Sequence, residues 1–260
     1  AFSVGWHNAK EDLPSLRLAN LAALQHPLSV DTYIEQTLRD AKAVLVRLIG
    51  GMPYWSYGLQ QLRAVAEENG IALAVLAADG RADSQLDDIS TLPVSTLRRL
   101  RQLCDAGGPD AASAALAQLA LSAGLFARPK IGQKNPPRVG GWSLQNRLSC
   151  PAAFALRVIP KPAVVISFYL SYLTAADLAP IEAAAQALEA RGFDVFGVFV
   201  PSLKEPESAA WLQRQMRLIA PVAILNATAF SGKGPDGASP LDIAEVPVFQ
   251  MALATSTRAA

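Results

Sequence analysis

The stretches AVVISFYL (residues 163–170), FDVFGVFV (193–200) and VAILN (222–226) decide the fold. Each is a short apolar run rich in β-branched or aromatic residues, which is typical of a buried strand. The segments between them, 175–190 and 206–218, have the composition and apolar spacing of helices. Apolar strands that alternate with helices predict a parallel sheet covered on both faces, and hence an α/β fold.

The same alternation occurs nearer the amino terminus. Strands are expected at 43–49 and 71–77, because both runs are apolar and the first ends at a double glycine. A last strand is expected at 248–253. The helices expected in this half span 29–41 with Ser29 as the N-cap, 56–69, 94–106 and 110–122. We therefore predict two Rossmann-like or flavodoxin-like lobes with mainly parallel sheets.

The predicted boundaries place a first α/β lobe at 1–126, a Pro-rich basic connecting segment at 127–161 and a second α/β lobe at 162–260. No Asp or Glu occurs between Ala111 and Ala176. Seven basic residues do occur there: Arg128, Lys130, Lys134, Arg138, Arg147, Arg157 and Lys161. A polycarboxylate macrocycle or an acidic protein would suit this charge, and a solvated linker explains it as well. The spacing is too loose to predict nucleic-acid binding.

Composition limits the kind of protein this chain can be. Of its 260 residues, 51% are hydrophobic and 17% are charged, and this composition supports a buried core. The net charge of +1 indicates no particular class of partner. The apolar runs are shorter than the roughly 20 residues of a membrane span, and the start does not resemble a signal peptide. Two unpatterned cysteines indicate a reducing, cytoplasmic location.

Catalytic patterns are absent from the sequence. The loop after the strand at 43–49 is not a GxGxxG dinucleotide fingerprint, and the sequence contains no phosphate loop GxxxxGK[ST], no GxSxG and no HExxH. Two histidines and two cysteines are too few for a convincing metal site. We therefore predict no catalytic residue, no metal ligand and no bound cofactor in this chain.

The first candidate binding site is the loop that follows the strand at 43–49. A double glycine allows a sharp turn, and ligands of open α/β sheets lie at the carboxyl ends of the strands. Three aromatic side chains within four positions could stack on a flat ring, or could instead pack the loop against protein. The candidate residues are Arg47, Gly50, Gly51, Tyr54, Trp55 and Tyr57.

Two further candidates follow strands of the second lobe. Asn226 and Thr228 come at the end of the run 222–226, where an amide and a hydroxyl could bind a ligand or could instead fix their own turn. Lys204 follows the strand at 193–200 and could meet a carboxylate, although a surface lysine is more often only solvated.

At these same residues the sequence resembles the cobaltochelatase and magnesium chelatase large-subunit family. The similarity runs in order over residues 12–258, and the combination of motifs is more specific than any one of them. In the first half it rests on PSLRLANL at 14–21, HPLSVD at 26–31, VRLIGG at 46–51 and YWxYG at 54–58. In the second half it rests on FVPSLK at 199–204, ILNATAF at 224–230, PVFQ at 247–250 and ATSTR at 254–258.

The resemblance implies a function for a larger protein. Large subunits of this family bind hydrogenobyrinic acid a,c-diamide and cobalt. A separate AAA+ ATPase subunit and its partner subunit, which carries an adhesion-type domain, couple ATP hydrolysis to cobalt insertion in cobalamin biosynthesis. Related magnesium chelatase subunits act on protoporphyrin, and the Gly-Gly-x-x-Tyr-Trp loop favours the cobalt branch. Family members are several times longer, so we expect this chain to be an N-terminal fragment, with the metal-handling residues beyond residue 260.

Two alternatives of other classes remain open at this stage. A two-lobe binding or sensor module, similar in plan to periplasmic binding proteins, would also have parallel α/β lobes. A small α/β enzyme of unknown chemistry is the other, and the lack of a nucleophile and base pair counts against it.

Overall fold

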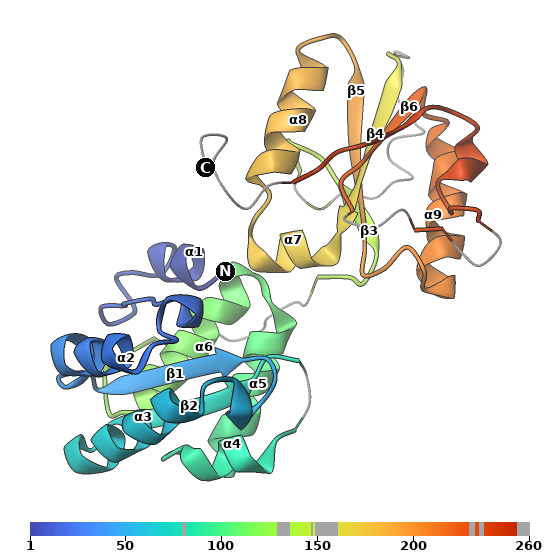
Figure 1. Ribbon diagram of the computed structural model, residues 1–260. Coiled ribbons are helices and arrows are strands. Elements are labelled where there is room, and N and C mark those ends of the chain that lie inside the picture. The colour runs from blue at the N-terminus through green and yellow to red at the C-terminus, as the bar shows by residue number, and fades with distance from the viewer. Residues whose placement is uncertain are drawn as a thin grey trace. The chain divides into compact units, whose positions relative to one another are not determined.

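The computed structural model describes residues 1–79, 82–128, 136–146, 148, 161–228, 232–233 and 237–253. The chain divides into two compact units, Ala1–Asn135 and Pro136–Ala260 (Figure 1). Each unit has its own sheet and its own hydrophobic core. The three-part division at residues 126 and 161 stays a prediction.

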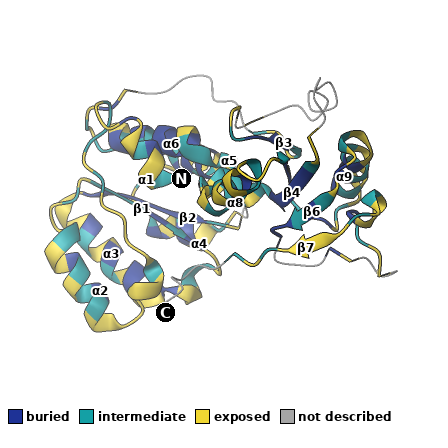
Figure 2. Ribbon diagram, turned by 90° about the horizontal axis from the view of Figure 1, so that it is seen from above, coloured by how far each residue is buried: buried dark blue, intermediate teal, exposed yellow. Residues whose placement is uncertain are grey.

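The second unit is built on a five-stranded sheet in the order β3-β5-β4-β6-β7. Its strands are β3 (Gly140–Trp142), β4 (Ala163–Tyr169), β5 (Asp194–Val200), β6 (Ala223–Asn226) and β7 (Val248–Gln250). All pairs are parallel except β3 with β5, and β4 is buried along most of its length whereas β7 is exposed (Figure 2). The four parallel strands, numbered along the chain, have the spatial order 2-1-3-4 of a flavodoxin-like sheet. The predicted fold class is therefore confirmed.

Helices cover both faces of this sheet. Its helices are α7 (Leu170–Ala175), α8 (Ala179–Glu189) and α9 (Pro206–Ile219), with a 3-10 turn at η5 (Asp242–Ala244). One core joins α9 to side chains of β4, β5 and β6, and another joins α8 to the opposite side chains of the same strands. The helix predicted at 175–190 begins later, at Ala179, because Ala176 adopts a left-handed backbone with φ of 56° and separates α7 from α8.

Strand β3 lies inside the stretch that the sequence analysis assigned to the connecting segment. Its Trp142 is fully buried and meets Phe168 edge-on, with 6.2 Å between ring centroids. Gly197 lies opposite Trp142 in the ladder, and a Cβ at that glycine would be only 2.7 Å from the indole. Residues 140–142 therefore belong to the second sheet, and a close fit between an indole and a glycine holds them there.

The first unit has a sheet of two parallel strands, β1 (Ala43–Leu48) and β2 (Ala72–Ala77). Successive side chains of β1 enter different cores: Val44, Val46 and Leu48 contact the first, and Ala43 and Leu45 the second. The helical elements around them are α1 (Phe2–His7), η1 (Leu21–Ala23), α2 (Pro27–Tyr33), η2 (Ile34–Leu38), η3 (Met52–Tyr54), α3 (Ser56–Asn69), α4 (Ser84–Ile89), α5 (Val94–Ala106) and α6 (Gly108–Ser122).

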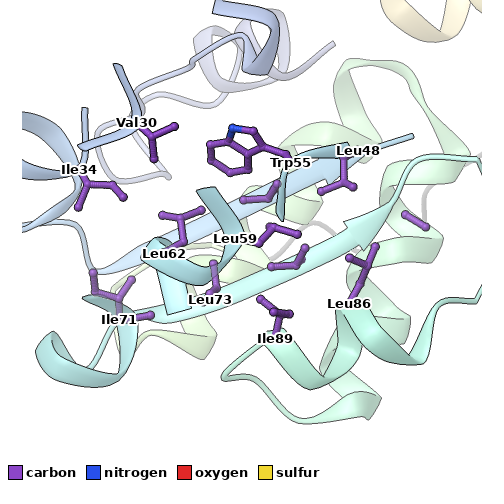
Figure 3. Close-up of a cluster of buried hydrophobic side chains, with 14 residues drawn as sticks. Val30, Ile34, Leu48, Trp55, Leu59, Leu62, Ile71, Leu73, Leu86 and Ile89 are labelled. Atoms are coloured by element: carbon purple, nitrogen blue, oxygen red, sulfur yellow. The ribbon is translucent and has the colours of Figure 1, made fainter. Parts of the chain in front are cut away.

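The two cores take their helices from different parts of the chain. Figure 3 shows the first core, where Val30 of α2 and Leu59 and Leu62 of α3 pack with side chains of both strands. The second core uses α5 and α6. The helix predicted at 29–41 begins earlier, because the imidazole of His26 accepts a hydrogen bond from the Leu28 N–H at 3.2 Å and acts as the N-cap in place of Ser29.

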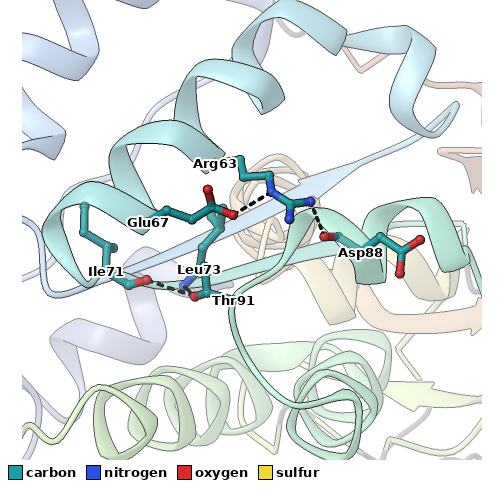
Figure 4. Close-up of polar contacts among 6 residues, drawn as sticks. All are labelled: Arg63, Glu67, Ile71, Leu73, Asp88 and Thr91. Atoms are coloured by element: carbon teal, nitrogen blue, oxygen red, sulfur yellow. Dashed lines mark hydrogen bonds and ion pairs between the residues drawn. The ribbon is translucent and has the colours of Figure 1, made fainter.

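Side chains close the outer edge of β2. The Thr91 hydroxyl accepts a hydrogen bond from the Leu73 N–H at 2.8 Å and donates one to the Ile71 carbonyl at 2.9 Å (Figure 4). The Ser90 hydroxyl accepts from the Val75 N–H at 2.9 Å. In the same region Arg63 of α3 bonds to Glu67 and to the Asp88 carbonyl. Backbone donors that an edge strand would offer to another chain are therefore used within the unit.

Replacing Thr91 tests this closure. Thr91→Val removes the hydroxyl while keeping the shape, so the Leu73 N–H loses its partner, and we expect the free energy of unfolding to fall by about 1 kcal/mol. The Leu73 amide should also exchange its hydrogen faster. Thr32→Val, at an exposed position of α2, is the matched control and should change neither quantity. Equal behaviour of the two variants in urea unfolding and hydrogen exchange would contradict the closure.

Candidate functional site

The loop after β1 turns at Gly50 and Gly51, whose φ angles are 94° and 68°. Both values lie in the left-handed region that favours glycine. A Cβ at Gly51 would also lie 3.0 Å from the Asp83 carboxylate. The double glycine is therefore explained by the turn and by this close approach, and it directs the chain through η3 into α3.

Trp55 is a core residue of the first unit. Only 7% of its surface is exposed, and its indole N–H donates to the Leu24 carbonyl at 2.7 Å (Figure 3). A Cβ at Gly58 would lie 2.1 Å from the indole ring, so the first turn of α3 needs glycine at that position. The ring thus faces the protein in this structure, as the packing alternative of the sequence analysis expected.

Tyr54 and Tyr57 are the aromatic side chains of this loop that reach solvent, with exposed fractions of 49% and 37%. The Tyr57 hydroxyl lies 2.8 and 3.0 Å from the two carboxylate oxygens of Asp31. Its hydrogen bond to that carboxylate raises the pKa of Tyr57 above its ordinary value. Tyr57 therefore ties α2 to the start of α3, and Tyr54 presents the more open ring.

Arg47 lies on the other face of β1. Its guanidinium forms an ion pair with Asp105 of α5 at 3.1 Å, and its buried Nε has no hydrogen-bond partner among the residues that the structure describes. Neighbouring Cys104 is buried, and that burial raises the pKa of its thiol to about 11. Because Arg47 faces α5 while Trp55 packs into the core on the opposite face, the structure does not bring these two candidates together.

In the second unit, Asn226 and Thr228 join a buried polar network. The Asn226 Oδ1 accepts hydrogen bonds from the Ser167 hydroxyl and the Thr228 hydroxyl, both at 2.8 Å, and from the Thr228 N–H at 3.3 Å. Its Nδ2 donates to Gln250 at 3.0 Å, and Gln250 donates to the Thr228 carbonyl at 2.6 Å. The amide of Asn226 is therefore engaged in tying the carboxyl ends of β4, β6 and β7 together.

Sequence reasoning missed Ser167 and Gln250 as members of this network. A signal for Ser167 exists, because it is the one hydroxyl-bearing residue other than Tyr169 within the apolar run at 163–170. Gln250 is part of the PVFQ motif but carries no pattern that predicts a partner. Only the pairing of β6 with β7 places it opposite Asn226.

Lys204 is exposed after the end of β5, and its N–H donates to the Ser202 hydroxyl at 3.1 Å. Within the described ranges, this lysine forms no hydrogen bond or ion pair with the network around Asn226. The neighbouring Glu205 is already engaged with the Ser208 hydroxyl at 2.6 Å and with Arg138. Lys204 thus stays a separate candidate.

The described part of the basic segment is partly neutralised within each unit. Arg128 forms an ion pair with Asp12 at 3.3 Å, and Arg138 forms one with Glu205. Lys161 is exposed. Lys130, Lys134, Arg147 and Arg157 lie outside the described residues. In the ranges that are described, no group of three or more His, Cys, Asp or Glu side chains could hold a metal ion, and no helix is long and apolar enough to cross a membrane.

Comparison with known proteins shows which class of protein the chain is similar to. Residues 149–260 match the family model described as CobN/Magnesium Chelatase, a metal-chelatase family. More particularly, the chain is 34% identical to the aerobic cobaltochelatase subunit CobN of Sinorhizobium sp, over 97% of this chain and 21% of that protein. It is 31% identical to the subunit of the same name from Pseudomonas aeruginosa, over 87% of this chain and 18% of that protein. The resemblance to the cobaltochelatase large subunit is confirmed.

A solved structure agrees in fold. The catalytic subunit of cobaltochelatase from Mycobacterium tuberculosis superposes with a TM-score of 0.69 over 96% of this chain and 20% of that one, at 18% sequence identity. The chain thus spans about a fifth of the length of the relatives it matches. The curated relatives carry the cobalt name, which favours the cobalt branch over the magnesium branch.

The burial of Trp55 predicts a large effect on stability. Trp55→Ala should lower the free energy of unfolding by about 3 kcal/mol or more, because it empties a core position. Tyr54→Ala, at a position with an exposed ring, should stay within about 0.5 kcal/mol of the original chain. Gly58→Ala should destabilise the original chain, and should be neutral or stabilising in the Trp55→Ala background. Urea unfolding of the single and double variants measures all of these, and an unchanged stability of Trp55→Ala would refute the core assignment.

The network around Asn226 makes a second prediction. Asn226→Ala leaves the hydroxyls of Ser167 and Thr228 buried without their acceptor, so the free energy of unfolding should fall by about 1–3 kcal/mol. Asn69→Ala, which removes an exposed amide at the end of α3, is the control and should cost less. If Asn226→Ala were as stable as the control, the amide of Asn226 would be available for a ligand.

Proposed function

We propose that this chain is part of the tetrapyrrole-binding large subunit of an ATP-dependent cobaltochelatase. The substrate of the full enzyme is hydrogenobyrinic acid a,c-diamide, and the reaction inserts Co²⁺ during cobalamin biosynthesis. The observation that carries this proposal is the 34% identity, over 97% of the chain, to a protein named aerobic cobaltochelatase subunit CobN. It favours the chelatase over the two-lobe binding or sensor module and over the magnesium enzyme.

The division of labour follows from what the chain carries. Its sequence has no phosphate loop, so we assign ATP hydrolysis to an AAA+ ATPase subunit with its adhesion-type-domain partner. It has two histidines, which are few for a metal site. We place the metal-handling residues in the part of the large subunit outside this chain. Cobalt and ATP are substrates of the complex, and this chain holds neither as a cofactor. The use of ATP supports a cytoplasmic location.

The geometry of the loop suggests how the first unit contributes. Trp55 anchors the loop in the core, so Tyr54, with 49% of its surface exposed, is the ring placed to contact the macrocycle or the domain that positions it. Arg47 is engaged with Asp105 and holds β1 to α5. Binding by Lys204, Asn226 or Thr228 stays a weaker part of the proposal, because the polar groups of Asn226 are used internally.

The proposal is tested on the full-length protein, reconstituted with the ATPase subunit and its partner. Cobalt insertion, followed by the change in corrin absorbance, should require all three components and ATP. The 1–260 chain alone should neither insert cobalt nor hydrolyse ATP above a control purified from cells without the gene. Insertion of Mg²⁺ into protoporphyrin without cobalt insertion would assign the protein to the magnesium branch, and ATP turnover by the 1–260 chain would overturn the division of labour.

A further inference from the structure

Strand β7 differs from the other strands of its sheet in being exposed along its whole length. Figure 2 shows it in the colour of exposed residues, and the exposed fractions of Val248 and Phe249 are 41% and 57%. Val248 lies opposite Ile224, which packs on the α9 side, and Phe249 lies opposite Leu225, which packs on the α8 side. Apolar side chains are therefore uncovered on both faces at this end of the sheet.

The outer backbone edge of β7 also has no partner strand among the described residues. The Pro247 carbonyl accepts a hydrogen bond from the Ile224 N–H, and the Met251 N–H donates one to the Asn226 backbone carbonyl. The backbone groups at these alternate positions of β7 therefore face β6. In a parallel ladder the intervening residues direct their N–H and C=O groups to the other side. The backbone groups of Val248 and Gln250 therefore point away from β6, and no strand in the described part of the chain pairs with them.

The other sheet edges of the protein are covered to a greater extent than the edge at β7. Hydroxyls of Ser90 and Thr91 bond to β2, and the short antiparallel strand β3, with its buried Trp142, ends the far side of the second sheet. The outer edge of β1 carries no strand among the described residues either, but its side chains are at least partly buried. An exposed apolar edge such as β7 is a site where another strand adds.

The topology indicates which strand that is. Along the chain, β4, β6 and β7 follow one another outward in space, and a flavodoxin-like sheet of order 2-1-3-4-5 places its next strand beside the fourth. Crossovers between parallel strands are right-handed, so the next connection would lie on the same face as α9, where it would cover Val248. About four fifths of the related proteins lies outside the part that matches this chain.

From these observations we infer that a further parallel strand, supplied by the part of the longer protein outside this chain, pairs with the open edge of β7. Its connecting segment covers Val248 on the α9 face. The inference concerns the completion of the second sheet and does not depend on the metal, the macrocycle or ATP.

Hydrogen exchange of the β7 amides tests the inference without a ligand. The amides of Val248 and Gln250 should exchange at least about 100-fold more slowly in the full-length protein than in the 1–260 chain, because a paired strand opens only with its cooperative unit. In the full-length protein, Val248→Asp should abolish the protection at Gln250. Val222→Asp, which changes a valine of similar exposure (48%) just before β6, is the matched control and should retain the protection.

Three outcomes would overturn the inference. Equal exchange of Val248 and Gln250 in the two proteins would leave the edge of β7 open. Protection in the 1–260 chain that rises with its concentration would assign the edge to a second copy. Protection of the full-length protein that appears only after addition of the other subunits would assign it to a partner. None of these measurements uses cobalt insertion, so failure of the proposed function would leave this test intact.

Discussion

Parallel strands bury apolar side chains on both faces and leave unpaired hydrogen-bonding groups along each outer edge of a sheet. Both the faces and the edges must be covered, and most elements of this protein can be understood from that requirement. In its described residues the first unit has the two strands β1 and β2. Helices α2, α3 and α4 pack on one face of this sheet, and α5 and α6 pack on the other. Since a two-stranded sheet has a high proportion of edge, the hydroxyls of Ser90 and Thr91 take up the donors of β2. In the second unit, Gly197 lies opposite Trp142 and leaves room for its indole. The short strand β3 can therefore pair with β5 at the edge of the sheet.

The same constraint decides the role of the aromatic loop. Covering the face of β1 that carries Val46 and Leu48 requires a large side chain near the start of α3, and Trp55 supplies it. The indole then needs glycine at position 58 and an acceptor for its N–H, which the Leu24 carbonyl provides. Of the candidate aromatic residues in the loop, Tyr54 is therefore the least committed to the protein's own packing.

Much of the fold could be predicted from the sequence, because strands and helices of this size have strong apolar patterns. Helices α3 and α5 have the predicted bounds, and the main strands differ by a residue or two. What failed depended on single backbone or side-chain contacts. His26 displaced Ser29 as N-cap because its imidazole accepts from the Leu28 N–H. The left-handed backbone of Ala176, which has no sequence signal, delayed the start of the helix predicted at 175–190. Strand β3 has three residues, too few for any period, and exists only through its pairing with β5.

The candidate sites were harder to predict than the fold, because exposure is set by residues distant in sequence. Trp55, Tyr54 and Tyr57 are equivalent in the sequence pattern. Trp55 is distinguished by its place in the hydrophobic core and its bond to Leu24, and Tyr57 by its bond to Asp31. Asn226 and Thr228 were placed correctly at the carboxyl end of a strand. Their polar groups, however, bond to Ser167 and Gln250, whose positions follow from strand pairing. A polar residue at a strand end is thus a weak sign of ligand binding when neighbouring strands offer it partners. On this reasoning, exposed apolar side chains such as Tyr54 in the first unit and Val248 and Phe249 of β7 in the second are better candidates for contact with another part of a protein than these polar strand ends.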